Sequence, residues 1–64
     1  MDIWTEILSR DPVRITQAFN QLNSTEKITV RAHLIKMTTE DGWHTGQVNS
    51  ASISLEAIKH LPDA

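Results

Sequence analysis

Histidines are the residues of this chain most able to bind a metal ion. The sequence has three of them: His33, His44 and His60. Imidazole nitrogens and carboxylate oxygens are common zinc ligands, so Glu40 and Asp41 could complete a site. Two ligands on one helix share a face when they lie three or four residues apart, and within a single predicted helix only Glu56 and His60 do so. We therefore expect no metal site and no cofactor.

Residues 38–44 are the stretch most able to support catalysis. They combine threonine hydroxyls, carboxylates and the imidazole of His44, which a neighbouring acid could orient as a general base. Polar residues and glycine are also typical of a helix end, and a domain of this size has little volume for a ligand pocket. We expect no catalytic residue and no enzyme, and we interpret the stretch as structural, with a binding role as the alternative.

Length and composition limit the classes of protein to which the chain can belong. Its 64 residues make one domain, which buries only about 60% of the surface that the unfolded chain exposes. The sequence has no cysteine, which excludes disulfides and cysteine-ligated clusters and fits a reducing cytosol. No apolar run approaches the roughly 20 residues of a membrane span, and the first residues lack the basic charge of a signal peptide. We therefore expect a soluble, cytoplasmic protein without a membrane segment.

Apolar spacing and capping residues predict the first two helices. The first covers residues 2–9, with Asp2 as its N-cap. Its apolar stripe is formed by Ile3, Trp4, Ile7 and Leu8. It must end before Pro12, because the residue preceding proline avoids helical backbone angles. The second helix covers residues 12–22, with Asp11 as its N-cap and proline at its first position. Its apolar stripe is formed by Ile15, Ala18, Phe19 and Leu22.

The segment over residues 24–40 fits two kinds of structure. Asn23 and Glu26 predict a helix start with a capping box, yet apolar and polar residues alternate inside the segment as they do in a strand. As a helix it would carry two opposite apolar stripes: Ile28, Ala32 and Ile35 on one side, and Val30, Leu34 and Met37 on the other. We predict a helix, because a lone strand would have nothing to pair with. Gly42 is expected to form its left-handed C-cap, with Trp43 folding back as the apolar contact.

A fourth helix is predicted over residues 45–60. Its N-cap is His44 or Thr45, and Pro62 stops it. Its expected inner face is formed by Val48, Ala51, Ser52, Leu55 and Ile58. The predicted fold class is therefore all-α, a small bundle or orthogonal array of four short helices in a single domain over residues 1–64.

Between Asp11 and Leu61 the chain carries a series of helix-boundary and core residues. They are Arg14-Ile15, Ala18-Phe19, Leu22, Glu26, His33-Leu34, Met37-Thr38-Thr39-Glu40, Gly42-Trp43-His44, Gln47 and Ser50-Ala51. In this pattern the chain resembles short helical proteins of bacteria that have no assigned function. Ser24 and Thr45 stand where we would expect proline after a cap. The resemblance implies the helical fold and no particular activity.

A helix-turn-helix that binds nucleic acid is the alternative function, because the second and third helices are predicted to meet at a short turn. The residues that would face DNA are Lys27, Arg31, His33 and Lys36. Glu26 would lie at the start of the recognition helix, and the formal net charge is -2. The basic residues are also spread along the chain instead of forming a stripe. Nucleic acid is therefore not the partner that we favour.

Surplus apolar surface is the strongest remaining feature of the sequence. The third helix has two apolar stripes, Ile53 points away from the inner face of the fourth helix, and Trp4 lies on a helix too short to bury it. We predict four partner-binding residues: Trp4, Val30, Met37 and Ile53. The favoured function is a small helical protein–protein interaction or accessory domain that self-associates through apolar helix faces. A bundle that buries both stripes in its own core is the open alternative.

Overall fold

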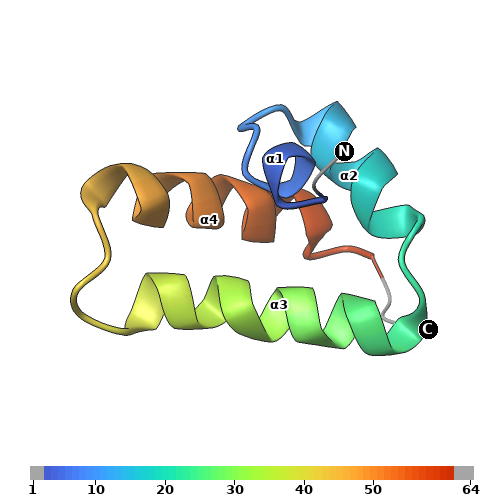
Figure 1. Cartoon of the computed structure of the whole chain (residues 1–64). Helices are drawn as coiled ribbons and strands as arrows, with labels where there is room; N and C mark the ends of the chain where they lie inside the picture. The colour runs from blue at the N-terminus through green and yellow to red at the C-terminus, as the bar shows by residue number, and fades with distance from the viewer. Residues whose placement is uncertain (1–2, 62–64) are drawn as a thin grey trace.

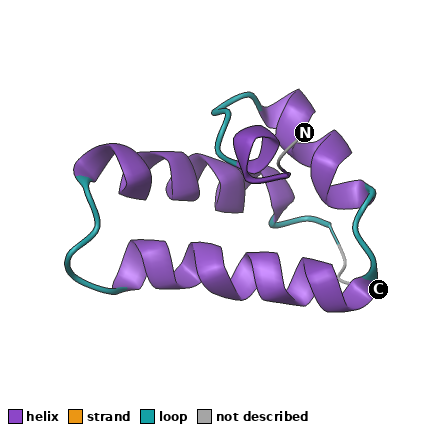
Figure 2. Ribbon diagram, viewed as in Figure 1, coloured by secondary structure: helices purple, strands orange, loops and turns teal. Residues whose placement is uncertain are grey.

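The computed structural model describes residues 3–61, which form helices joined by short loops and contain no strand (Figure 1, Figure 2). The helices are α1 (Ile3–Ile7), α2 (Pro12–Asn20), α3 (Ser24–Thr39) and α4 (Thr45–Ile58). The all-α fold and the helical third segment are thus confirmed. Each helix ends one or two residues earlier than the pattern predicts, because terminal turns lack partners for their last carbonyl groups. The predicted cap Asp2 and the predicted stop Pro62 lie outside the described residues.

The helices pack around α4 (Figure 1). Helices α3 and α4 lie side by side and antiparallel, joined by residues 40–44, while α2 packs on α4 and α1 packs on α2. No helix in residues 3–61 has the length and apolar character needed to cross a membrane.

The predicted caps form the starts of α2 and α3. The Val13 amide donates to Asp11 Oδ1 at 3.0 Å, which satisfies one of the free amides of the first turn of α2. At α3 the Glu26 amide donates to Asn23 Oδ1 at 2.8 Å, and the Asn23 amide donates to Glu26 Oε1 at 3.1 Å. This is the predicted capping box. His44 is the N-cap of α4, and its amide donates to Gln47 Oε1 at 3.1 Å.

Gly42 adopts the predicted left-handed conformation but at a different place relative to the helix end. Its φ is 98°, while α3 stops at Thr39 and its C-cap Glu40 is extended. The glycine therefore shapes the turn toward α4 and does not itself cap α3. Trp43 is half-buried and packs against the core.

The core is aliphatic around one phenylalanine, and it corrects the prediction for α3. Its buried hydrophobic residues are Ile7, Ile15, Ala18, Phe19, Val30, Leu34, Met37, Ala51 and Ile58. Val30 and Met37 are therefore core residues and cannot be partner-binding surface of the folded monomer. With this stripe turned inward, Arg31 Nη2 donates to the carbonyl of Leu61 at 2.8 Å and its guanidinium lies 5.3 Å from the Phe19 ring centroid. Arg31 thus fastens α3 to the end of α4 and to α2.

The face of α4 that packs against the core carries smaller side chains than the sequence predicts. Ser52 was expected inside and is exposed, whereas Ser50 and Ser54 are buried beside Ala51. Small side chains on this face allow α4 to pack closely against both α2 and α3. The Ser54 hydroxyl is fully buried and has no hydrogen-bond partner among the described residues.

Two arginines tie the N-terminal part of the fold together. Arg14 makes a paired contact with Glu6, with Nε and Nη2 each 2.8 Å from a carboxylate oxygen, and so joins α2 to α1. Arg10, in the loop after α1, has a left-handed φ of 66°. Its side chain donates to Ser50 Oγ at 2.9 Å and to the Gly46 carbonyl at 3.0 Å, which connects this loop to the start of α4.

Candidate functional site

A row of apolar side chains remains uncovered on the outer side of α3, and we call it the α3 stripe. It consists of Ile28, Ala32 and Ile35, which lie at positions i, i+4 and i+7 and so share one helix face. Ile28 is 55% exposed and Ile35 is 47% exposed. The stripe faces away from the core because Val30, Leu34 and Met37 occupy the opposite side of the helix.

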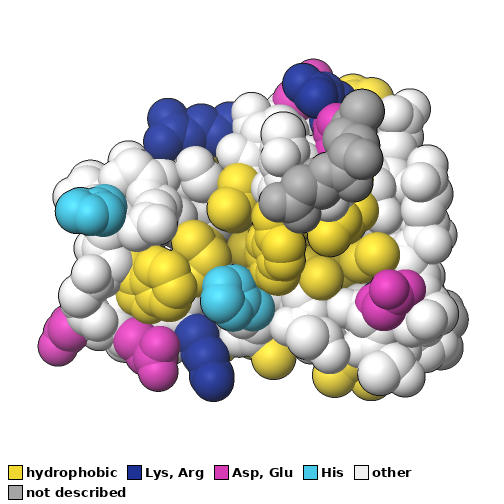
Figure 3. Space-filling view, in the orientation of Figure 1, with side chains coloured by type: hydrophobic (Ala, Val, Ile, Leu, Met, Phe, Trp, Pro, Cys, Tyr) yellow, Lys and Arg dark blue, Asp and Glu magenta, His cyan; other side chains and the backbone are white. Residues whose placement is uncertain are grey.

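An aromatic cluster lies beside the stripe and is formed by Trp4, His33 and Trp43. The His33 ring centroid is 4.9 Å from that of Trp4, with the planes tilted by 59°. It is 5.8 Å from that of Trp43, in an edge-to-face arrangement of 81°. The three rings come from α1, α3 and the loop before α4, so the cluster joins segments far apart in the sequence. One face of the molecule shows an apolar band with a single histidine set into it (Figure 3).

Both tryptophans lie at the surface, although the domain has few aromatic side chains. The chain contains two tryptophans, one phenylalanine and no tyrosine. Phe19 is fully buried, whereas Trp4 and Trp43 are half-buried and cover the core from outside. Tryptophan at a surface is typical of residues that contribute most to protein interfaces.

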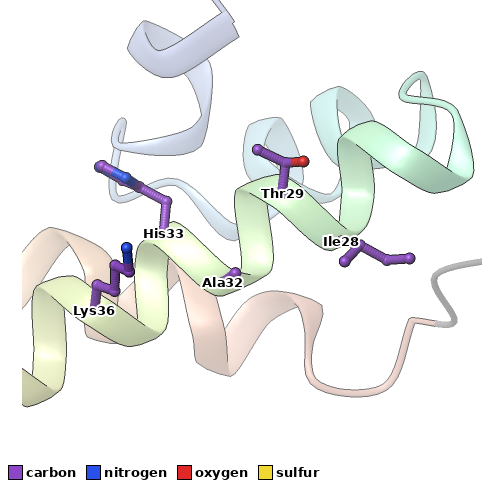
Figure 4. Close-up of a pocket in the computed structure, with 5 residues that line it drawn as sticks. All are labelled: Ile28, Thr29, Ala32, His33 and Lys36. Atoms are coloured by element: carbon purple, nitrogen blue, oxygen red, sulfur yellow. The ribbon is translucent and has the colours of Figure 1, made fainter.

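A shallow depression connects the stripe with the cluster (Figure 4). It is lined by Ile28, Thr29, Ala32, His33 and Lys36. All of these residues belong to α3, and His33 points toward α1 (Figure 4). Because one helix supplies the whole lining, no opposite wall encloses a small molecule. The surface therefore suits another macromolecule better than a small ligand.

Some basic side chains of α3 lie at this surface, and others make contacts within the domain. Lys36 lies at the edge of the depression. Lys27 Nζ lies 5.7 Å from the Phe19 ring centroid, and Arg31 binds carbonyls at the end of α4. His33 packs between the tryptophans. Of the four residues that a helix-turn-helix would present to DNA, three are thus engaged in contacts within the domain.

Electrostatic pairs elsewhere are local. Hydrogen bonds from Arg14 lower the pKa of the Glu6 carboxyl below its usual value, and the neighbouring charge of Arg14 acts in the same direction. The hydrogen bond from Lys59 lowers the pKa of Glu56 in the same way. These pairs stabilise α1 and the end of α4, and they lie outside the α3 stripe and the aromatic cluster.

The predicted partner-binding residues differ in how far they are buried. Trp4 belongs to the aromatic cluster and is half-buried. Ile53 is also half-buried and packs against the core, so only part of its side chain is available to a partner. Val30 and Met37 are buried, as described above. The predicted surplus on α3 is present, but it lies on the opposite stripe.

The residues with possible metal or catalytic chemistry are not brought together. Within residues 3–61, no three histidine, aspartate or glutamate side chains group as metal ligands. The Thr38 and Thr39 hydroxyls both donate to the Ile35 carbonyl at 2.9 Å, so they bind the end of their own helix. His44 is an N-cap. Residues 38–44 therefore have the arrangement of a helix end and a turn.

The sequence placed Ile28 and Ile35 on one apolar stripe but did not identify that stripe as the exposed one, and it did not predict the grouping of His33 with Trp43. The apolar spacing on α3 was a sufficient signal for a surplus stripe, but not for which stripe is exposed. The aromatic cluster has no local signal, because it depends on how α1 and the loop after α3 are folded over the helix.

Comparison with known proteins gives no relative: no protein-family model, no curated protein and no solved structure matches this chain.

Proposed function

We propose that this chain is a small cytoplasmic protein–protein interaction domain whose partner is a second copy of itself. It acts by binding and not by catalysis. Its contact surface consists of the α3 stripe together with the aromatic cluster beside it.

The observation that carries this proposal is the exposure of Ile28 and Ile35 in one row. They are 55% and 47% exposed, and a large aliphatic side chain that stays in water forgoes roughly 1.5–3 kcal/mol relative to full burial. A domain of this size has a total stability of only about 3–5 kcal/mol. A partner that covers this row recovers part of the free energy of burying the isoleucines. Even part of it is large relative to the total stability of the domain.

The neighbouring aromatic rings support the same surface. Trp4 and Trp43 already contact His33, so their orientations are restrained before a partner arrives. Restrained side chains lose less conformational entropy on binding than free ones, which favours association.

Mass measured against concentration tests the proposal. Analytical ultracentrifugation from about 10 μM to about 1 mM covers the range of a weak dimer. The wild-type mass should rise toward twice the monomer mass, whereas Ile28→Lys and Ile35→Lys should remain monomeric. Both variants should keep their helical circular dichroism, because neither side chain is in the core.

Val13→Lys is the matched control. Val13 is 64% exposed, which is more than either isoleucine, but it lies on α2 and outside the α3 stripe. This variant should associate like the wild type. A monomeric mass for the wild type at every concentration would end the proposal, and association retained in both Ile28→Lys and Ile35→Lys would place the interface elsewhere.

A further inference from the structure

We infer that the second copy binds antiparallel, α3 against α3, with the two-fold axis of the dimer passing between Arg31 and Ala32. This inference rests on the proposed self-association and adds to it the orientation and register of the partner.

The order of side chain sizes along the stripe makes it complementary to itself. Ile28 and Ile35 are large and lie seven residues apart, with the small Ala32 between them. In an antiparallel pair centred between positions 31 and 32, Ile28 of one copy lies opposite the partner's Ile35. The alanine at the crossing lets the two helices approach closely, because the distance between packed helices depends on the side chains at the contact. The two pairs of Ile28 and Ile35 then lie symmetrically on either side of the two-fold axis, as an isologous interface requires.

Charge also favours the antiparallel orientation. In a parallel pair Lys36 would lie beside the partner's Lys36, and Glu40 and Asp41 beside their own copies. In the antiparallel pair the two Lys36 positions are about 13.5 Å apart along the axis, at about 1.5 Å per residue. Lys36 is then level with the partner's Lys27, but in each copy Lys27 Nζ lies 5.7 Å from the Phe19 ring centroid and is thereby directed away from the stripe. Glu40 and Asp41 then lie next to the start of the partner's α3, where the positive end of the helix dipole favours negative charge.

Arg31 is the cation nearest to the axis, and its side chain is directed away from the stripe. Its Nη2 donates to the carbonyls of Ile58 and Leu61 at 3.3 Å and 2.8 Å, and these bonds are part-buried. The guanidinium also lies 5.3 Å from the Phe19 ring centroid. Because the fold already holds Arg31, two copies can meet at Ala32 without bringing the guanidinium groups together.

The area of the stripe sets the strength of this dimer. Helix α3 has 16 residues. A helix of that length presents about 24 Å × 10 Å, or about 240 Å² in projection. A stable interface buries about 800 Å² per partner, so α3 alone supplies about a third. The dissociation constant should therefore lie in the micromolar range or above.

Disulfide trapping tests the orientation, and the chain suits it because its sequence has no cysteine. Ser24 and Thr39 are exposed at opposite ends of α3, close to the line of the stripe. In the antiparallel register Ser24 of one copy lies opposite the partner's Thr39. Single variants Ser24→Cys and Thr39→Cys should therefore not cross-link to themselves under mild oxidation. An equimolar mixture of the two should give the mixed dimer, because paired chains hold the thiols at an effective concentration of about millimolar order.

Three further measurements make each outcome decisive. Ala32→Cys should cross-link to itself, since it lies next to the axis, and Val13→Cys on α2 should show only the slow background of random collision. Self-linking of Ser24→Cys and Thr39→Cys without a mixed dimer would show a parallel pair and overturn the orientation while leaving self-association intact. Absence of all these cross-links, with a dimer mass by ultracentrifugation, would place the interface outside the α3 stripe and overturn the inference. A monomer mass would instead refute the proposed function.

Discussion

Replacing Gly42 and Gly46 one at a time by alanine applies the same chemical change to two positions four residues apart with opposite backbone requirements. Gly42 has a φ of 98°, and a Cβ added there would meet no atom within 4 Å. The cost of alanine is therefore confined to the backbone, and it amounts to about 1–2 kcal/mol for a left-handed residue. Alanine also restricts the unfolded chain, which offsets about 0.4–1 kcal/mol. The net loss of unfolding free energy should be about 1 kcal/mol.

Gly46 should respond in the opposite direction. It lies in the first turn of α4, and an added Cβ would stand 3.5 Å from Arg10 Nη2, an ordinary contact distance. Alanine is favoured over glycine within a helix by roughly 0.5–1 kcal/mol. The Gly46 carbonyl that accepts from Arg10 is retained in the variant, so Gly46→Ala should stabilise the domain.

Thermal melting followed by circular dichroism at the helical minimum measures both effects. In a domain of this length 1 kcal/mol corresponds to about 4–8 °C in Tm. Gly42→Ala should melt several degrees below the wild type and Gly46→Ala a few degrees above it. A Tm for Gly42→Ala equal to or above that of the wild type would refute the conclusion that this turn requires a left-handed residue. A shift of the same sign in both variants would refute the assignment of the two backbones.

Two other substitutions test single contacts. Ser54→Ala should raise the unfolding free energy by about 1 kcal/mol, because it removes a buried hydroxyl that has no partner among residues 3–61; a destabilised variant in chemical denaturation would show that the hydroxyl is bonded. The Glu6 carboxyl has its pKa lowered by Arg14, so the pair stabilises the fold above the carboxyl's unfolded pKa and ceases to do so as the pH falls through the folded value. Between about pH 6 and about pH 3, the Tm of the wild type should therefore fall more than that of Glu6→Gln, and equal slopes would show that the pair does not contribute.

Helix starts were predictable from the sequence because their chemistry is local. Asp11 before Pro12, and Asn23 three residues before Glu26, supply the hydrogen-bond acceptors for free amides within their own turn. No distant segment has to be known. The sequence left His44 and Thr45 as the two possible caps of α4, and His44 is its N-cap.

The inward faces of α3 and α4 were less predictable, because they are decided by partners elsewhere in the chain. The two stripes of α3 are similarly apolar, and burial of the Val30 side accompanies contacts of Arg31 with Phe19 and with the end of α4. The burial of Ser50 and Ser54 on α4 depends on close helix packing, which apolar spacing alone does not report. The candidate site was predicted as a surplus on α3, and its actual residues required the packed structure.

The backbone conformation and the side-chain contacts of Arg10 favour different residue types, and no single residue type meets both requirements. Its backbone, at a φ of 66°, favours glycine or asparagine, while its side chain binds Ser50 and the Gly46 carbonyl as only a guanidinium can. Arg10→Gly would relieve the strain and leave the buried Ser50 hydroxyl without its donor. A lysine would keep the charge and lose the forked contact. The position is locally frustrated, and its substitutions are coupled to those at a residue 40 positions away in the chain. We therefore expect a substitution at Arg10 to be tolerated better when Ser50 on α4 is replaced as well.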